Sequence, residues 1–362
     1  MNRSASPGIS TFSTSAAPTP APARGAGAFA GLAAVPALIW GVNFAVIDAG
    51  LSGFPPLLFA ALRFALVGAC CLVVPRPRVA ASRLLLVGLF MGTGQYGLLY
   101  LGMAAGMPSG LSALVMQAQV PFTILIAAVV PGERPTARQG AGVAVSLVGL
   151  AAVGAARGGA VTIGALLLVT GGAACFAAGN IFTRLAQADS GFRLVVWSSL
   201  VPPLPLFALS LAAEGPRRDA DAVAHAGPGA WLALAATVVL ASLLSMGLWS
   251  ALLGRYPADR VVPYALAIPV VGLATGWLVR GEQITTPTVG GAGLVLGGLA
   301  LVVMPAARSA ADRGRSAGER AAAGDELPLV VEGEGDWDGD GDGDGADADQ
   351  AAPAKDAATL RA

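Results

Sequence analysis

Arg63 is the residue with the clearest chemical implication, because it is a lone arginine inside a long apolar segment that follows Pro55 and Pro56. A guanidinium in such a segment costs a few kcal/mol to bury, so it should face a cavity or a partner. Its planar fork of N–H groups matches a carboxylate in bidentate geometry. The segment therefore predicts an anchor for a substrate carboxylate. The alternatives are an arginine that extends to lipid headgroups, or one that holds a neighbouring helix through carbonyl groups.

Amide and aromatic side chains inside other apolar segments form the rest of the candidate site. In lipid such groups need partners, so we expect them to point inward, toward a neighbouring helix or toward a substrate. Trp40 also fits an interfacial anchor, and a helical spacing places Gln117 and Gln119 on nearly opposite faces. With Arg63, the candidate substrate-binding residues are Trp40, Asn43, Gln95, Tyr96, Gln117, Gln119, Asn180 and Tyr264.

Signatures of an enzyme are missing from the apolar segments. The only histidine, His225, lies in a polar stretch, so neither a histidine metal cluster nor a Ser-His pair forms among these segments. Cys70, Cys71 and Cys175 fall in apolar runs, where cysteine is typically a small packing residue. The chain has no GxxxxGK phosphate loop. We therefore expect no catalytic residue, no metal site, no cofactor and no ATP-driven step.

Three carboxylates, those of Asp48, Glu133 and Glu282, lie at the ends of apolar segments. A solvated carboxylate or a helix cap is the usual role at such a position. Asp48 is the best placed of the three to titrate with a translocated proton. No single buried carboxylate indicates the energy source of a transport cycle.

The apolar residues fall in runs that match the thickness of a bilayer. Of the 362 residues, 55% are hydrophobic and 12% are charged, whereas a soluble domain carries roughly 25% charged residues. Spanning a bilayer takes about 20 apolar residues in a helix. The sequence thus predicts an all-α membrane protein with ten transmembrane helices, near residues 27–48, 56–74, 83–104, 107–130, 137–155, 160–183, 194–212, 230–253, 260–279 and 287–305.

The arginines indicate the orientation, because short cytoplasmic loops retain positive charge. One set of alternate loops carries only Arg157, Arg217, Arg218 and Arg280. The other set, with both terminal segments, carries Arg3, Arg24, Arg76, Arg78, Arg83, Arg134, Arg138, Arg184, Arg193, Arg255, Arg260, Arg308, Arg313, Arg315 and Arg320. Both termini are therefore predicted to be cytoplasmic. We expect residues 1–26 to be disordered, and residues 306–362, where Asp and Gly alternate, to form a disordered acidic tail.

The two halves of the membrane region repeat one another. Residues 132–133 (Gly-Glu) recur at 281–282, an offset of 149, and residues 149–151 (Gly-Leu-Ala) recur at 298–300. Earlier in each half, the matching residues lie fewer than 149 positions apart. A longer loop over residues 214–228, in the second half, accounts for the difference. Because each half has an odd number of spans, five, the second must be inverted relative to the first, as in many secondary transporters. The predicted repeats cover residues 27–155 and 160–305.

Several short motifs in a fixed order resemble the EamA family of the drug/metabolite transporter superfamily. They are Trp40-Gly41-Val42-Asn43-Phe44, Leu62-Arg63-Phe64, Gly106-Met107-Pro108-Ser109-Gly110-Leu111, Gln117-Ala118-Gln119, Gly132-Glu133-Arg134, Gly179-Asn180-Ile181-Phe182, Leu252-Leu253-Gly254-Arg255-Tyr256 and Pro269-Val270-Val271-Gly272-Leu273. The resemblance covers about residues 28–305. It is greatest to the bacterial exporters of O-acetylserine and cysteine in that family.

This resemblance implies a central cavity between helices one to four and six to nine, and export of small amino-acid-like metabolites across the cytoplasmic membrane by alternating access. By position, the cavity would draw on Asn43, Arg63, Gln95, Gln117, Gln119, Asn180 and Tyr264. Family members often carry a lysine where this chain has Asp48, which leaves the charge of the substrate open.

The partners that we expect are a small metabolite and the lipid bilayer, with no nucleic acid; a homodimer stays open. The alternatives are transport of another substrate class, such as drugs or sugars, and a membrane scaffold or enzyme that transports nothing.

Overall fold

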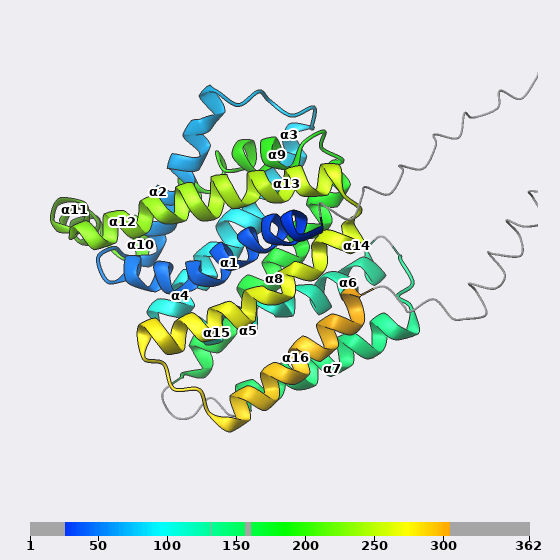
Figure 1. Ribbon diagram of the computed structural model, residues 1–362. Helices are drawn as coiled ribbons and strands as arrows, with labels where there is room; N and C mark the ends of the chain where they lie inside the picture. The colour runs from blue at the N-terminus through cyan, green and yellow to red at the C-terminus, as the bar shows by residue number, and fades with distance from the viewer. Residues whose placement is uncertain (1–25, 131, 156–160, 305–362) are drawn as a thin grey trace, which may run out of the picture. The chain divides into compact units, whose positions relative to one another are not determined.

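The computed structural model describes residues 26–130, 132–155 and 161–304, which are helical apart from short connections (Figure 1). The first half contains α1 (Ala26–Leu51), α2 (Pro56–Ala69), η2 (Cys70–Leu72), α3 (Ala81–Val87), η3 (Gly88–Gly94), α4 (Gln95–Ala104), α5 (Ser109–Val115), η4 (Met116–Ala118), α6 (Gln119–Val129) and α7 (Ala137–Ala155). The second half contains α8 (Ile163–Ala186), α9 (Gly191–Ser198), α10 (Pro203–Ala213), α11 (Pro216–His225), α12 (Pro228–Ala236), η5 (Thr237–Leu244), α13 (Ser245–Arg255), α14 (Ala258–Val261), η6 (Val262–Leu266), α15 (Ala267–Arg280) and α16 (Thr286–Val303).

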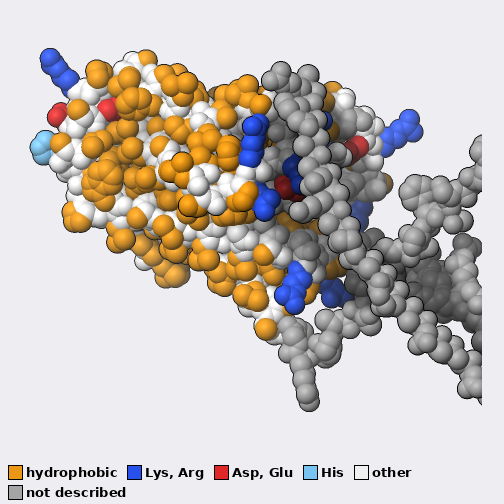
Figure 2. Space-filling view, turned by 90° about the horizontal axis from the view of Figure 1, so that it is seen from above, with side chains coloured by type: hydrophobic (Ala, Val, Ile, Leu, Met, Phe, Trp, Pro, Cys, Tyr) orange, Lys and Arg blue, Asp and Glu red, His pale blue; other side chains and the backbone are white. Residues whose placement is uncertain are grey.

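The membrane-spanning character of the chain is confirmed. Within the described ranges, nine helical segments are long and apolar enough to cross a bilayer, and the apolar segment Pro56–Leu72 is shorter. Together they coincide with the ten predicted spans, and their ends differ by a few residues. Figure 2 shows hydrophobic side chains over the left and middle of the visible face, with charged side chains at its left tip and over its right half. Of the N-terminal segment predicted at residues 1–26, only Ala26 is described, as the first residue of α1. The predicted acidic tail at residues 306–362 lies outside the described residues.

Successive spans run in opposite directions between two ends of the helical bundle. The Asp48 end contains the C-terminus of α1, helix α11 and the C-terminus of α15 (Figure 1). The Arg184 end contains the C-termini of α6 and α8 and the start of α14. Among the described loops, those that the arginine pattern assigned to one side of the membrane therefore lie at one end of this bundle.

The stretch from Glu214 to Pro228, which the sequence predicted as a loop, contains helix α11, so that prediction was wrong. Gly215 turns the chain with a φ of 96°, and Pro216 begins the helix at its first position, where no N–H is needed. Asp219 lies in the first turn and His225 in the last, which suits the helix dipole. A short amphipathic helix of this kind is too polar to resemble a membrane span.

The carboxylate of Glu214 caps the start of α2, the helix that carries Arg63. Its two oxygens accept the backbone N–H groups of Leu57 at 2.9 Å and Leu58 at 3.2 Å. The Ser210 hydroxyl donates to the same carboxylate at 2.5 Å and also contacts Asp219. Glu214 thereby fixes the start of α2 against α10 and α11.

We expect Glu214→Ala to lower the free energy of unfolding by about 0.5–2 kcal/mol, the usual contribution of a helix cap. The measurement is unfolding in mixed micelles with increasing SDS, followed by tryptophan fluorescence. Glu214→Gln keeps an oxygen acceptor and should lose less. Asp221→Ala, an exposed carboxylate on α11, serves as the control. Equal stability of Glu214→Ala and the wild type would contradict the assignment.

Five of the described spans contain irregular helical turns, and four of these turns recur at about the spacing of the repeat. The π-helical segments η3 and η5 begin at Gly88 and Thr237, which are 149 residues apart. The 3₁₀ turns η4 and η6 lie shortly before Pro121 and Pro269, whose missing N–H groups release carbonyls of the preceding turn. The two halves therefore share local backbone geometry as well as sequence.

Helices α7 and α16 show that the halves are related by an approximate two-fold axis. A Cβ atom on Gly142 would lie 2.6 Å from the Gly298 carbonyl oxygen, and one on Gly298 would lie 2.6 Å from that of Gly142. Gly149 and Gly291 face each other in the same reciprocal way, at 2.8 and 3.0 Å. Gly291 and Gly298 are the 149-residue counterparts of Gly142 and Gly149. Such an exchange of partners is the signature of an isologous interface, so one half is inverted relative to the other.

Candidate functional site

Arg63 is buried between α2, α4 and η5, where hydroxyl groups surround its guanidinium. Its side chain is 3% exposed. Nη1 donates to the Tyr100 hydroxyl at 2.7 Å, and Nη2 donates to the Tyr96 hydroxyl at 3.3 Å. Nε and Nη2 both donate to Ser242 Oγ, at 3.1 and 3.0 Å. We call Arg63, Tyr96, Tyr100 and Ser242 the Arg63 cluster.

Aromatic rings and a π-helical turn hold this cluster in place. The guanidinium carbon lies 4.1 Å from the centroid of the Tyr96 ring, and this ring meets Tyr100 edge to face at 5.8 Å. Ser242 donates its proton to the carbonyl of Thr237, five residues earlier in η5. Its oxygen is therefore free to accept from Arg63.

The positive charge of Arg63 has no anionic partner in the part of the chain that the structure describes, where the ion pairs are Arg184–Glu133, Arg193–Asp189 and Arg280–Asp48. A guanidinium has five N–H groups, and the four bonds above leave one on Nη1. Burial and these bonds exclude extension to the headgroups. Arg63 does hold two neighbouring helices, through hydroxyl rather than carbonyl groups. What the arrangement lacks is a carboxylate.

Tyr100→Phe should lower the free energy of unfolding by about 1–3 kcal/mol, because it leaves a second buried Nη1 donor without an acceptor. The loss should be visible in the same SDS titration. Tyr256→Phe is the control, since its hydroxyl makes no hydrogen bond to any described residue. A Tyr100→Phe protein as stable as wild type would show that the 2.7 Å bond contributes nothing.

Gln119 and Asn180 pair with each other in a second polar cluster, between α6 and α8. Asn180 Nδ2 donates to Gln119 Oε1 at 2.7 Å and to Thr123 Oγ1 at 3.3 Å. The Thr123 hydroxyl in turn donates to the Gln119 carbonyl at 2.6 Å. These bonds use one oxygen and one nitrogen of the two amides, which leaves the Gln119 amide nitrogen and the Asn180 amide oxygen to meet another group.

Three further predicted residues, Asn43, Gln95 and Gln117, are buried amides whose side chains make no hydrogen bond to any described residue. Gln95 immediately precedes Tyr96 at the start of α4, and Gln117 lies in the η4 turn. Asn43 instead lines an apolar groove of about 200 Å³ beside α12. The amide atoms of Gln95 and Gln117 are not sealed off from solvent, so these two amides are the best suited to meet a ligand.

Trp40 and Tyr264 make no hydrogen bond to the Arg63 cluster. The Trp40 indole N–H donates to the carbonyl of Ala241 in η5 at 2.9 Å, and its ring packs edge to face on Trp249. Tyr264 packs near Phe29, ring centroids 6.0 Å apart, among apolar residues toward the Arg184 end. Trp40 thus uses its polar group to join α1 to η5.

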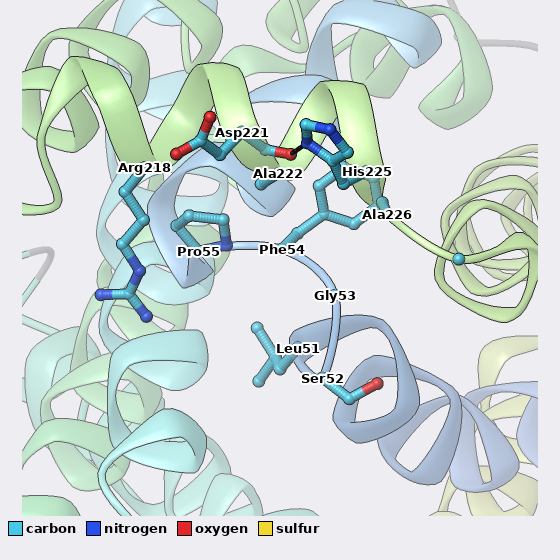
Figure 3. A pocket seen from close by; sticks show the side chains of 11 residues that line it. Leu51, Ser52, Gly53, Phe54, Pro55, Arg218, Asp221, Ala222, His225 and Ala226 are labelled. Atoms are coloured by element: carbon cyan, nitrogen blue, oxygen red, sulfur yellow. Dashed lines mark hydrogen bonds between the residues drawn. The ribbon is translucent and has the colours of Figure 1, made fainter.

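A pocket of about 420 Å³ at the Asp48 end contains none of the predicted site residues. Figure 3 shows Leu51 to Pro55 of the α1–α2 turn on one side and Arg218, Asp221 and His225 of α11 on the other. Asp48 lies at the same end of the bundle and forms an ion pair with Arg280. Its carboxylate is therefore paired rather than simply solvated.

Three residues that bond to the predicted ones were not among the candidate substrate-binding residues: Tyr100, Ser242 and Thr123. Each carried a signal, because Tyr100 and Thr123 lie one helical turn after Tyr96 and Gln119, and Ser242 is a polar residue in an apolar run. The assignment of a partner to each residue required the packing of the helices.

The sequence profile of the EamA-like transporter family matches this chain twice, over residues 28–155 and 163–304. The chain belongs to the EamA-like transporter family. The boundary between the two matches falls after α7. It is the same boundary that separates the two halves related by the two-fold axis between α7 and α16.

Two curated relatives carry the name "Probable amino-acid metabolite efflux pump". The protein from Salmonella typhimurium is 38% identical over 275 residues, and the one from Escherichia coli is 36% identical over 275 residues. Each alignment covers 74% of this chain and 92% of the relative. A crystal structure with a TM-score of 0.53 and 18% identity, which covers 76% of this chain and 97% of its own, shares the fold.

The location of this EamA-family chain follows from its helices and its relatives. A relative from Escherichia coli, 22% identical over 258 residues, is named an uncharacterized inner membrane transporter; the alignment covers 68% of this chain and 81% of the relative. The chain is a multi-pass protein of the cytoplasmic membrane and belongs to a family of small-molecule transporters.

Proposed function

We propose that this protein exports small amino-acid-like metabolites of the cysteine and O-acetylserine type, and that Arg63 binds their carboxylate. The observation that carries the proposal is a buried guanidinium held by three hydroxyl groups, with no carboxylate partner among the described residues. Neutral hydroxyls orient the guanidinium but leave its charge uncompensated. A substrate carboxylate supplies both the missing charge and the acceptor for the remaining N–H.

The other side chains receive roles that match their free groups. Gln95 and Gln117, which lack internal partners, bind the amine or the polar side chain of the substrate. Gln119 and Asn180 offer a second amide contact from α6 and α8. Tyr96 forms an apolar wall beside Arg63, and Trp40 fixes the helix that carries Asn43. Tyr264 lies toward the Arg184 end, on the path of the substrate.

The transport cycle is alternating access without ATP and without chemical change of the substrate. We infer ten spans, with Pro56–Leu72 as the second, and a cytoplasmic location for the Arg184 end and both termini; the arginine pattern supports this orientation. The repeats at residues 27–155 and 160–305 move relative to each other around the Arg63 cluster. The names of the two efflux-pump relatives support this direction and this substrate class.

Counterflow in proteoliposomes tests the substrate assignment. Vesicles loaded with unlabelled cysteine should accumulate external labelled cysteine, and unlabelled O-acetylserine inside should drive the same uptake. Cysteamine, which is cysteine without its carboxylate, is the matched control and should drive none. Equal counterflow with cysteamine would refute a carboxylate anchor. No counterflow with either amino acid in folded protein would refute the substrate class, and drug and sugar panels would follow.

A further inference from the structure

Glu282 joins two crossing spans at the Asp48 end. It follows α15, and its carboxylate accepts the Ser109 backbone N–H at 2.6 Å, the Ser109 hydroxyl at 2.5 Å and the Gly110 N–H at 2.9 Å. These groups begin the span Ser109–Val129. The Ser109 hydroxyl bonds to this carboxylate and does not cap its own helix. The backbones are also close, since a Cβ on Gly110 would lie 3.1 Å from the Gly272 carbonyl oxygen.

The repeat supplies a counterpart for each part of this contact. Glu133 corresponds to Glu282, and both glutamates follow a glycine with a φ near 70°, Gly132 at 70° and Gly281 at 68°. The backbone N–H of each glutamate donates at 3.1 Å to an earlier carbonyl of its helix. Ser109 and Gly110 correspond to Ala258 and Asp259, which begin the span Ala258–Arg280. The two turns thus have the same backbone geometry.

The second contact is not formed. The Glu133 carboxylate pairs with Arg184 at 3.0 Å instead, and its side chain is 54% exposed. Ala258 and Asp259 are exposed as well. Helix α5 packs along α15 at the Asp48 end, whereas α6 has no comparable packing on α14 or η6 at the Arg184 end. The spans that contain Glu133 and Glu282 therefore converge at one end and separate at the other.

We propose that Glu282 and Glu133 are the two closing contacts of an alternating gate. In this structure Glu282 closes the Asp48 end. When the halves exchange conformations, Glu282 leaves Ser109 and Gly110, and Glu133 leaves Arg184 to meet the start of the span Ala258–Arg280. A carboxylate is stabilised there by free backbone N–H groups and by the helix dipole.

The chain biases this gate toward the observed state. Glu282 meets a hydroxyl and a glycine, Ser109 and Gly110, whereas Glu133 would meet an alanine and a second carboxylate, Ala258 and Asp259. Closure at the Arg184 end therefore lacks one hydrogen bond and brings two negative charges together. Asp259→Gly, which copies the residue at position 110, removes that repulsion.

Two distances between nitroxide labels test the gate in the full-length protein, with Cys70, Cys71 and Cys175 replaced by serine. One pair, at Val129 and Arg255, spans the Arg184 end, and the other, at Ala105 and Ile284, spans the Asp48 end; all four residues are exposed. Glu282→Gln should shorten the first distance and lengthen the second, and should change the ratio of the two populations about tenfold. Asp259→Gly should shift both distances in the same directions, without any change to the contacts of Glu282.

The controls separate a gate from a structural role. Glu133→Gln should leave the observed state populated, and Asp189→Asn, which removes an exposed pairing with Arg193, should change neither distance. Unchanged distances in both Glu282→Gln and Asp259→Gly, or distances that move in the same sense at the two ends, would overturn the proposal. The inference rests on the transporter function but not on its substrate, because the distances are measured without one. A failed counterflow assay therefore leaves this test intact.

Discussion

Arg63→Ala is expected to reduce counterflow of cysteine at least about tenfold in folded protein. The guanidinium offers a carboxylate its charge and the one N–H group that the cluster leaves free, and a hydrogen bond between charged groups contributes about 1.5–3 kcal/mol. About 1.4 kcal/mol corresponds to a factor of ten in affinity. No second cation replaces it, since the ion pairs of the other described arginines lie at the two ends of the bundle.

Two variants define how the loss is interpreted. Arg63→Lys keeps the charge but not the planar fork, so it should retain measurable counterflow with a raised KM. Arg78→Ala removes an exposed arginine at the Arg184 end and should transport as wild type does. Full transport by a well-folded Arg63→Ala protein would remove Arg63 from the site and leave it as a residue that joins α2 to α4 and η5.

Gly298→Ala is expected to lower the free energy of unfolding by about 1–3 kcal/mol, as overpacking typically does. Its new methyl group would lie 2.6 Å from the Gly142 carbonyl oxygen and against Ser146, so backbone must move. Flexible side chains elsewhere cannot relieve this contact. Because the interface is reciprocal, Gly149→Ala should cost a similar amount, through Gly291.

The adjacent residue gives a control of opposite sign. A Cβ atom on Gly297 would meet no atom within 4 Å, and alanine is favoured over glycine in a helix by about 1 kcal/mol. Gly297→Ala should therefore be neutral or stabilising in the SDS titration, whereas Gly298→Ala destabilises. Equal effects of the two substitutions would contradict the close approach of α7 and α16.

The ends of the bundle show how the two halves share one geometry with different residues. Asp48 on α1 pairs with Arg280 on α15, and in the other half Arg184 on α8 pairs with Glu133, which follows α6. The two ion pairs join spans that correspond in the repeat. The acid of one pair lies on the span that corresponds to the span of the base in the other pair. Because the geometry is the same and the charges are reversed, Glu133 has two partners at the Arg184 end. It pairs with Arg184 in this state and, as proposed, it binds the start of α14 in the other state.

The sequence alone determined the membrane-spanning class, the approximate spans, the family and the repeat. These features depend on local quantities. The bilayer responds to the length of each apolar run, and the repeat is a comparison of two stretches of one chain. Candidate residues such as Arg63 and Gln95 were found for the same reason, because a polar group in an apolar run is visible without any knowledge of its neighbours. The polar helix α11, which has no apolar run, was missed.

The tertiary structure decided which of these groups meet. Arg63 and Ser242 are 179 residues apart in sequence, and the π-helical turn η5 rotates Ser242 relative to a regular helix, so no periodicity predicts their contact. The same turn offers the Ala241 carbonyl to Trp40 and removes that tryptophan's polar group from the candidate site. The repeat also does not indicate that Glu282 binds the start of the facing span while Glu133 does not. Two equivalent sequences can occupy different conformations when their halves move as units around a shared axis.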